Sequence, residues 1–551
     1  MDTLPLPPEP EPLPPAPVSA HRQVLAAFDR IAEADRPDLW ITLRPVEEVL
    51  VDAKAVDERV RAGDVLPLAG LLVAVKDSID VAGLPTTAGC PAYAYTPDVS
   101  AVAIQRLTAA GAVVLGKTSL EEFDGPWGTG RPCGPGAAEE VVGLGLAGLA
   151  VGTGTAGSAP ASGVFGLKPT LGLVPTTGAV PSMRPYDCLT VFSPNLAEGL
   201  RALAAMTGPD TGDPLSRAWP ESVRLAAGER ARIAVPGAEG LTPLSGPARA
   251  GFDRIVADLL AWGAEVVPVD ITPFLVAAKL LQDGPLAAER HAAIGEFVAR
   301  EPSVGPAVAR AVLAAKEIPA YRLAAEQARL AEYRREAARV LDGFDALLLP
   351  AVPGQAALAG NFVNLLDLAA VAVPAGHAGG TPFGVSVITR AFDDQIALDV
   401  AAFLGGEQIG TPYPPTGIDL VVFGAHLRGQ PLNGQLTALG ARFRGDVRTA
   451  ARYRMVALPV VPPKPGILPA ADGAAIEGER WTLSPAALGR FLAGLPGPMT
   501  LGEIELEDGS TAIGFQCAAG LAGQARDITA FGGWRAYLRH LTATRHYTLA
   551  S

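Results

Sequence analysis

The chain has 551 residues, a length that is too great for a single hydrophobic core and predicts two or three domains. Hydrophobic residues make up 49% of the sequence and charged residues 18%, a composition that excludes general intrinsic disorder. The formal net charge of −13, with no concentrated run of Lys and Arg, excludes a nucleic-acid-binding surface.

The first predicted elements lead to a strand that ends in a lysine. Residues 1–18 are rich in proline and predict an extended or disordered tail. Residues 19–35 and 46–62 have helical spacing, and residues 66–76 predict an apolar strand that ends at Lys76. The Lys76 amine is either a solvated cap of the strand end or a desolvated base, and the sequence leaves both alternatives open.

A loop of small residues around Ser158 is the central feature of the sequence. Residues 98–118 predict a helix, a glycine stop and a buried strand, which is one βα unit of a largely parallel sheet. In residues 141–170, two apolar runs flank a loop of Gly, Thr and Ala that contains Ser158. Because Gly and Ala leave backbone N–H groups unshielded, this loop can hold an oxyanion beside a nucleophilic hydroxyl. The alternative is a glycine-rich turn in which the serine has no role.

The rest of the chain divides into two regions. Helical and strand patterns alternate up to about residue 405, and residues 321–342 form the clearest amphipathic helix. Residues 344–352 and 383–389 predict two further strands. Short strands, turn signals and a proline cluster follow, so we predict one domain at residues 19–410 and a second at residues 417–551.

The cysteines and histidines do not form the patterns of metal or disulfide sites. The four cysteines are widely spaced, which favours a reducing cytoplasm: Cys90, Cys133, Cys188 and Cys517. The six histidines are equally scattered, so no zinc site is expected. No apolar run of about 20 residues and no signal-like N-terminus is present, so neither membrane insertion nor export is predicted.

Several segments resemble the amidase signature family of amide-bond hydrolases. They are GLLVAVKDSIDVAGLPTTAGCPAYAY (70–95), AAGAVVLGKTSLEEF (109–123) and GTGTAGS followed by GLKPT (152–170). The allophanate hydrolases of this family are similar at residues 283–294, 361–376 and 381–388, and their C-terminal domain at residues 424–436, 462–483, 513–519 and 527–538. The resemblance implies an α/β amidase-signature fold, with a mixed, mostly parallel sheet flanked by helices, followed by a smaller α+β domain.

The resemblance also implies a serine–serine–lysine triad, in which Ser158 is the nucleophile and Lys76 the base. A bridging serine relays the proton, and the backbone amides of Thr155, Ala156, Gly157 and Ser158 line the oxyanion hole. The implied reaction is the hydrolysis of allophanate to ammonia and carbon dioxide, a cytoplasmic step of urea-type nitrogen catabolism. The implied partners are a small amide substrate and a second copy of the chain in a homodimer, without cofactor, metal, nucleic acid or membrane.

The bridging serine of the family is missing from this chain. No serine occurs between Ser119 and Ser158, and residues 131–145 have Gly, Pro and Ala at the corresponding place. An ordered water is one replacement for the relay between Lys76 and Ser158. Cys133 is disfavoured as a substitute nucleophile, because it lacks a neighbouring histidine.

Two further departures concern the nucleophile loop and a loop later in the chain. Gly154 stands where an aspartate is usual in the family, and the loop at residues 353–360 is abbreviated and lacks polar and aromatic residues for substrate recognition. The alternative to an active hydrolase is therefore a catalytically impaired paralogue that acts as a subunit or scaffold.

His426 is the candidate catalytic residue of the C-terminal region. In the family this domain is associated with decarboxylation of the first product, N-carboxycarbamate, by a histidine general base. His426 is the candidate for that role, with Asn433 and Gln435 as nearby polar partners, and the alternative is a structural histidine in a turn. Trp534 and Tyr537 are expected to anchor a terminal helix by packing.

Overall fold

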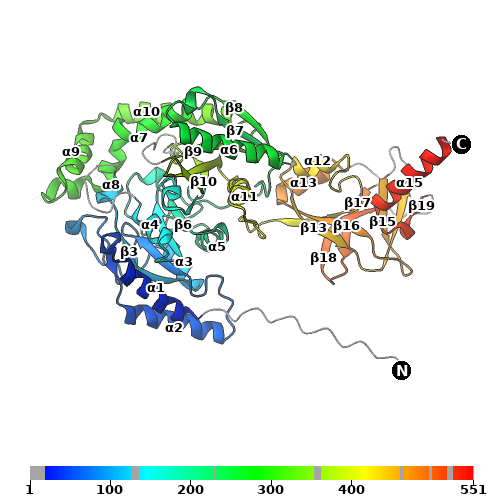
Figure 1. Ribbon diagram of the computed structural model, residues 1–551, viewed down its shortest axis with the longest axis horizontal. Helices are drawn as coiled ribbons and strands as arrows, with labels where there is room; N and C mark the ends of the chain where they lie inside the picture. The colour runs from blue at the N-terminus through cyan, green and yellow to red at the C-terminus, as the bar shows by residue number, and fades with distance from the viewer. Residues whose placement is uncertain are drawn as a thin grey trace.

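The computed structural model shows two bodies arranged along the long axis of the molecule (Figure 1). It describes residues 19–125, 136–228, 230–352, 362–458, 464–495, 499–517 and 525–549. The tail predicted at residues 1–18, Cys133 and the loop at residues 353–360 lie outside the described residues.

The larger body is built around an 11-stranded sheet with helices packed against it (Figure 1). The strand order is β1-β3-β2-β4-β6-β5-β10-β11-β9-β7-β8. The strands are β1 (Trp40–Leu43), β2 (Leu72–Lys76), β3 (Val113–Thr118), β4 (Leu149–Thr153), β5 (Phe165–Lys168), β6 (Leu189–Ser193), β7 (Arg232–Pro236), β8 (Glu265–Val269), β9 (Ala346–Ala351), β10 (Leu368–Ala378) and β11 (Thr381–Arg390). The helices are α1 (Ala20–Ala34), α2 (Val46–Arg61), α3 (Val102–Ala109), α4 (Ala137–Gly143), α5 (Leu196–Met206), α6 (Gly246–Trp262), α7 (Thr272–Asp283), α8 (Ala287–Arg300), α9 (Pro306–Ala314), α10 (Ala320–Val340) and α11 (Asp394–Gly405).

This sheet is mixed, as the sequence predicted, but it has fewer parallel pairs than the mostly parallel sheet that we expected. The parallel neighbours are β2 and β3, β2 and β4, β7 and β8, and β7 and β9. The other neighbouring pairs are antiparallel, and they include the long hairpin of β10 and β11. The difference arises because a buried apolar run does not encode the direction of the strand beside it.

Most predicted elements are present in the structure. The helices expected at residues 19–35, 46–62 and 321–342 correspond to α1, α2 and α10, and the late strands correspond to β9 and β11. The strand expected at residues 66–76 begins only at Leu72. The residues before it form a turn around Gly70, which has a φ of +75°.

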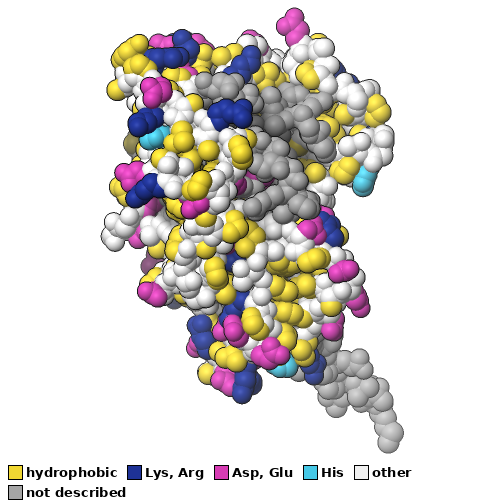
Figure 2. Space-filling view, turned by 90° about the vertical axis from the view of Figure 1, so that its left-hand side faces the viewer, with side chains coloured by type: hydrophobic (Ala, Val, Ile, Leu, Met, Phe, Trp, Pro, Cys, Tyr) yellow, Lys and Arg dark blue, Asp and Glu magenta, His cyan; other side chains and the backbone are white. Residues whose placement is uncertain are grey.

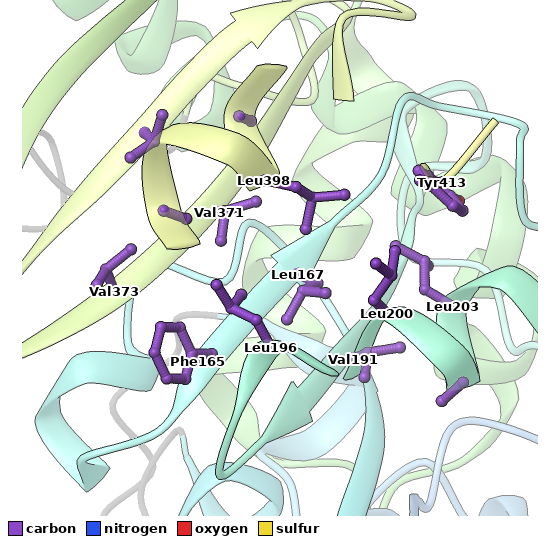
Figure 3. Packing of buried hydrophobic residues seen from close by; sticks show 14 of the residues in the cluster. Phe165, Leu167, Val191, Leu196, Leu200, Leu203, Val371, Val373, Leu398 and Tyr413 are labelled. Carbon is purple, nitrogen blue, oxygen red and sulfur yellow. The ribbon is translucent and has the colours of Figure 1, made fainter. Parts of the chain in front are cut away.

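An apolar core fixes the strands on either side of the Ser158 loop (Figure 3). Leu167 of β5 and Val191 of β6 are almost completely buried, and Leu196 and Leu200 of α5 belong to the same cluster. Each fully buried Leu or Val side chain stabilises the fold by about 1.5–3 kcal/mol. Since β5 follows the loop and β6 pairs with β4, which precedes it, this core holds both ends of the loop.

The smaller body has two sheets, with strand orders β13-β16-β12-β18-β17 and β15-β14-β19. Its core includes Trp481, Trp534 and Tyr537, all buried, which confirms the expected packing of the terminal helix. The strands are β12 (Ile418–Val422), β13 (Arg442–Arg448), β14 (Tyr453–Leu458), β15 (Lys464–Pro469), β16 (Glu477–Leu483), β17 (Met499–Glu505), β18 (Thr511–Cys517) and β19 (Arg526–Asp527). The helices are α12 (Asn433–Thr437), α13 (Pro485–Ala493) and α15 (Trp534–Leu549).

Arg442 of β13 connects the two bodies. Its guanidinium forms an ion pair with Asp399 of α11 at 2.9 Å and donates to the carbonyl oxygens of Leu225 and Ile409. The N–H of Leu225 donates in turn to the carbonyl oxygen of Gly440 at 2.9 Å. The start of β13 is therefore held against the larger body by an ion pair and by hydrogen bonds to the backbone.

On the face drawn in Figure 2, basic and acidic side chains are interspersed rather than separated. Among the described residues, no helix combines the length and the apolar character that crossing a membrane requires.

Candidate active site

The loop that carries Ser158 connects two strands of the central sheet. It leaves β4 after Thr153 and reaches β5 through a short 3-10 helix, Ala159–Ser162. Within it, Ala156 has a φ of +63°, a left-handed backbone conformation that costs a residue with a Cβ about 1 kcal/mol. The N–H of Ala159 donates to the carbonyl oxygen of Ala156 at 3.0 Å and closes the turn around Ser158. The packing of the loop therefore maintains a strained residue two positions before the serine.

The Ser158 hydroxyl donates a hydrogen bond to a carboxylate. Its partner is Oε1 of Glu139, at 2.6 Å. Glu139 lies in the first turn of α4 and is only 7% exposed. Both residues line a cavity of about 260 Å³. The serine of the loop is thus directed into a cavity and paired with a buried carboxylate.

Lys76, at the end of β2, lies in the wall of the same cavity. Its amine forms an ion pair with the carboxylate of Asp124 and donates to Thr153 Oγ1 at 2.8 Å. The Thr153 hydroxyl donates to the same carboxylate, which closes a group of three. The Lys76 side chain is 14% exposed, so it is not a freely solvated strand cap.

The remaining serine of the cavity wall does not connect Lys76 to Ser158. Ser119 lines the cavity, but its hydroxyl donates to the carbonyl oxygen of Asp38 at 2.7 Å. Within the described stretches, the Lys76 amine is bonded to Asp124 and Thr153, and the Ser158 hydroxyl is bonded to Glu139. The two groups therefore share no hydrogen-bond partner among the described residues. The structure brings the two predicted residues to one cavity without joining them by a serine relay.

Part of the backbone expected to hold an oxyanion lies in the wall of the same cavity. Thr155, Ala156 and Ser158 line the cavity, whereas Gly157 is not part of the lining. None of these four residues donates its N–H to another residue of the described part of the chain. Free N–H groups beside a hydroxyl are the arrangement that stabilises a tetrahedral oxyanion.

A second cavity of about 270 Å³ adjoins the first and shares Asp124 and Thr153 with it. It also contains Asp187, whose carboxyl accepts the backbone N–H groups of Ser182 and Met183. Burial raises the pKa of Asp187 against the effect of these N–H groups, and the neighbouring charge of Asp124 acts in the same direction as burial. The two cavities together give a polar space on either side of the Lys76 ion pair.

Asp124 and Glu139 are residues of the cavity that no sequence motif predicted. Asp124 follows a strand that was recognised, and Glu139 lies in the segment where the bridging serine is missing. The available signal was the pair of acidic residues, Glu139 and Glu140, within a run of small and apolar residues. An acidic residue that becomes buried in such a run needs a partner or a function.

The C-terminal candidate, His426, lies in the wall of a different cavity, of about 240 Å³, in the smaller body. Its Nε2 shares a hydrogen bond with Oε1 of Gln435 at 3.0 Å, and the Asn433 side chain donates to its backbone carbonyl at 2.8 Å. The imidazole stacks on Phe515, with ring centroids 5.2 Å apart, and meets the edge of Phe491. Both polar partners named from the sequence lie beside this histidine.

The environment of His426 favours its neutral form. Burial lowers the pKa of its imidazole, and the ammonium of Lys464, which lines the same cavity, acts in the same direction. The hydrogen bond with Gln435 opposes this change. A neutral imidazole beside a cation can accept a proton or bind an anion near neutral pH.

The residues described by the structure contain no group of three or more His, Cys, Asp and Glu side chains arranged for a metal ion.

Comparisons with known proteins match both bodies. The family model described as amidase matches residues 22–398, and the model described as allophanate hydrolase C-terminal domain matches residues 418–539. The chain is 32% identical to the urea amidolyase of Saccharomyces cerevisiae, over 91% of this chain and 31% of that protein. It spans about a third of the length of the curated urea amidolyases that it matches.

Solved structures are also similar to this chain. The allophanate hydrolase of Kluyveromyces lactis has a TM-score of 0.81 at 29% identity, over 95% of this chain and 97% of that one. The urea amidolyase of Kluyveromyces lactis has a TM-score of 0.83 at 30% identity, over 95% of this chain and 36% of that one. The similarity therefore extends over both bodies.

Proposed function

The chain belongs to the amidase family of hydrolases that act on C–N bonds and carries an allophanate hydrolase C-terminal domain, and from this premise we propose that it hydrolyses allophanate to ammonia and carbon dioxide. In the first step Ser158 attacks the terminal amide carbonyl and ammonia leaves. Water then hydrolyses the acyl-enzyme, which releases N-carboxycarbamate. The second step is the decarboxylation of this product in the C-terminal cavity. Carbon dioxide leaves, the nitrogen takes up a proton, and the carbamate that remains breaks down to ammonia and carbon dioxide.

One observation carries the first step. The Ser158 hydroxyl lies in the wall of a cavity and donates a hydrogen bond to a buried carboxylate, while no described residue accepts the N–H groups of the loop that would hold an oxyanion. A serine without a catalytic function needs neither a strained residue such as Ala156 before it nor a proton acceptor beside it. The amides of Thr155, Ala156 and Gly157 are the proposed oxyanion hole.

The C-terminal cavity supports the second step. Decarboxylation of a dianion such as N-carboxycarbamate requires a cation to bind it and a group to manage a proton. Lys464 and His426 line one cavity and supply both groups. The aromatic side chains of Phe491 and Phe515 exclude water from one side of the imidazole.

The ammonia released from allophanate tests the first step. We expect Ser158→Ala to lower kcat for ammonia release by about 10³–10⁶-fold, since binding and the oxyanion hole alone give the residual rate. Ser162→Ala, in the following 3-10 helix, is the matched control and is expected to retain the activity. Equal rates in the wild type and Ser158→Ala would contradict the proposed nucleophile.

A second candidate function is a catalytically impaired subunit or scaffold. The observation that favours it is the Lys76 amine, which is held by Asp124 and Thr153 and has no serine relay to Ser158 among the described residues. This function predicts that purified wild-type protein releases no ammonia from allophanate over a wide range of pH, although it folds. The same assay therefore separates the two functions.

A further inference from the structure

We propose that Glu139 is the catalytic base of the amidase cavity, the cavity lined by Lys76, Glu139 and Ser158. In activating Ser158, it takes the place of the lysine relay. The inference rests on the proposed function, because it names the proton acceptor for the proposed nucleophile. It starts from the direct contact at 2.6 Å between the Ser158 hydroxyl and Glu139 Oε1. A base must lie within this distance of the proton that it removes.

Among the described residues, the surroundings of Glu139 are not those of a structural carboxylate. Buried carboxylates are normally paired with a cation. Within the described residues, the Ser158 hydroxyl is the hydrogen-bond partner of Glu139 and no cation is paired with it. The next residue, Glu140, is partly exposed and forms an ion pair with Arg36 at 2.5 Å. Two adjacent glutamates of α4 thus serve different purposes, and only Glu139 faces the cavity.

The position of Glu139 explains how it reaches the serine. It lies in the first turn of α4, and α4 packs against β4 and against the 3-10 helix that follows Ser158. The segment that lacks the bridging serine, residues 131–145, therefore still supplies a proton acceptor, Glu139. Lys76 is occupied by Asp124 and Thr153 in the same wall.

The proposed steps balance in atoms and charge. Ser158 Oγ bonds to the terminal amide carbon of allophanate while its proton moves to Glu139 Oε1, which leaves a neutral carboxylic acid and an oxyanion held by the loop amides. The oxyanion collapses, the C–N bond breaks, and the amide nitrogen takes the proton from Glu139 and leaves as ammonia. Glu139 then accepts a proton from the water that attacks the acyl-enzyme and returns it to Ser158 Oγ.

A carboxylate base and a lysine base predict different pH profiles. Glutamate side chains ordinarily ionise near pH 4.3, and lysine side chains lose their proton near pH 10.4. A reaction that needs an ionised carboxylate loses rate as the pH falls, whereas one that needs a neutral amine gains rate as the pH rises. The slope of activity against pH thus reports which residue type removes the proton.

The experiment measures kcat/KM for ammonia release from allophanate between about pH 5 and pH 10 in the full chain. The variants are Glu139→Gln, which keeps the shape and removes the basicity, and Glu139→Ala with and without added formate. Glu140→Gln is the matched control, since it alters the neighbouring carboxylate that faces Arg36. Ser158→Ala tests the proposed function, and circular dichroism checks that each variant folds.

We expect Glu139→Gln to lower kcat/KM by about 10²–10⁴-fold and Glu140→Gln to change it less than about 2-fold. Formate is expected to restore part of the activity of Glu139→Ala, an effect that a merely structural glutamate does not give. Wild-type activity in Glu139→Gln, or a wild-type profile that rises only at alkaline pH, would overturn the assignment and leave Ser158 as the nucleophile. An inactive wild type, or an active Ser158→Ala, would overturn the proposed function and the assignment with it.

Discussion

The amidase cavity around Ser158 and the C-terminal cavity around His426 are similar in volume but use different physical means to prepare a reactive group. The amidase cavity, about 260 Å³, depends on close contacts between ionised and hydroxyl groups at strand ends and loops. The C-terminal cavity, about 240 Å³, surrounds one histidine with aromatic rings and a single cation. In the amidase cavity, the hydrogen-bond or ion-pair partner of each group determines its reactivity. In the C-terminal cavity, the burial of His426 determines it. The loss of a residue from the amidase cavity therefore changes the mechanism, whereas the reactivity of the C-terminal cavity depends on the packing around His426.

Among the changes that compare the two cavities, the substitution of His426 is expected to have the largest effect. His426→Ala is expected to slow the decarboxylation of N-carboxycarbamate by about 10²–10⁴-fold, because the imidazole that exchanges the proton is removed, while the first ammonia is released at the wild-type rate. The intermediate then accumulates and can be followed by ¹³C NMR. His377→Ala, at an exposed position in β10, is the control. Loss of the first ammonia release in His426→Ala would show that the cavities do not act independently.

The same change of glycine to alanine is expected to have opposite effects in the two bodies. A Cβ at Gly166 would lie 2.7 Å from the Ala156 Cβ and 2.9 Å from the Ala159 Cβ, so the loop of Ser158 must move. We expect Gly166→Ala to lower the free energy of unfolding by about 1–3 kcal/mol and to slow ammonia release. Urea denaturation measures the first effect, and partial recovery in the double variant with Ala156→Gly tests the contact.

In the smaller body, Gly489 lies within α13 and has open space where a Cβ would stand. Gly489→Ala is therefore expected to raise the free energy of unfolding by about 0.5–1 kcal/mol through helix propensity. A destabilised Gly489→Ala variant would contradict the steric explanation given for Gly166.

Removal of one charge from the amidase cavity tests whether paired groups stabilise it. Asp124→Asn leaves the mostly buried Lys76 ammonium without its carboxylate, so we expect a loss of about 1 kcal/mol in the free energy of unfolding. Asp64→Asn is the comparison, because the ion pair of Asp64 with Arg59 is about half exposed and worth little. Equal effects of the two variants in urea denaturation would argue against a stabilising role for the Lys76 pair.

The smallest expected effect is the pH dependence of stability at His426. Its pKa is lower in the folded protein than in the unfolded chain, so the unfolded chain binds the proton first. The contribution of the neutral imidazole to the free energy of unfolding is complete above the pKa of the unfolded chain, about 6.5, and is lost as the pH falls below that value. In urea denaturation, His426→Gln is expected to make the free energy of unfolding decrease less between pH 7.5 and pH 5. An unchanged slope would mean that burial does not act on the imidazole.

The sequence determined the family, the order of the two domains and the segments that hold Ser158, Lys76 and His426, because these depend on motifs that are local in the chain. Hydrophobic periodicity likewise located most helices and strands, since burial of one face needs only a regular spacing. Both kinds of information are carried by neighbouring residues.

Only the tertiary structure decided which groups touch. Glu139 and Ser158 are separated by 19 positions, and Lys76 and Asp124 by 48, and no spacing rule relates such pairs. Their contacts depend on how α4 and the strands β2 and β4 pack, which also fixed the strand directions that the apolar runs left open. A side chain becomes a base or an ion-pair partner through its neighbours in space, and folding, not proximity in the chain, selects those neighbours.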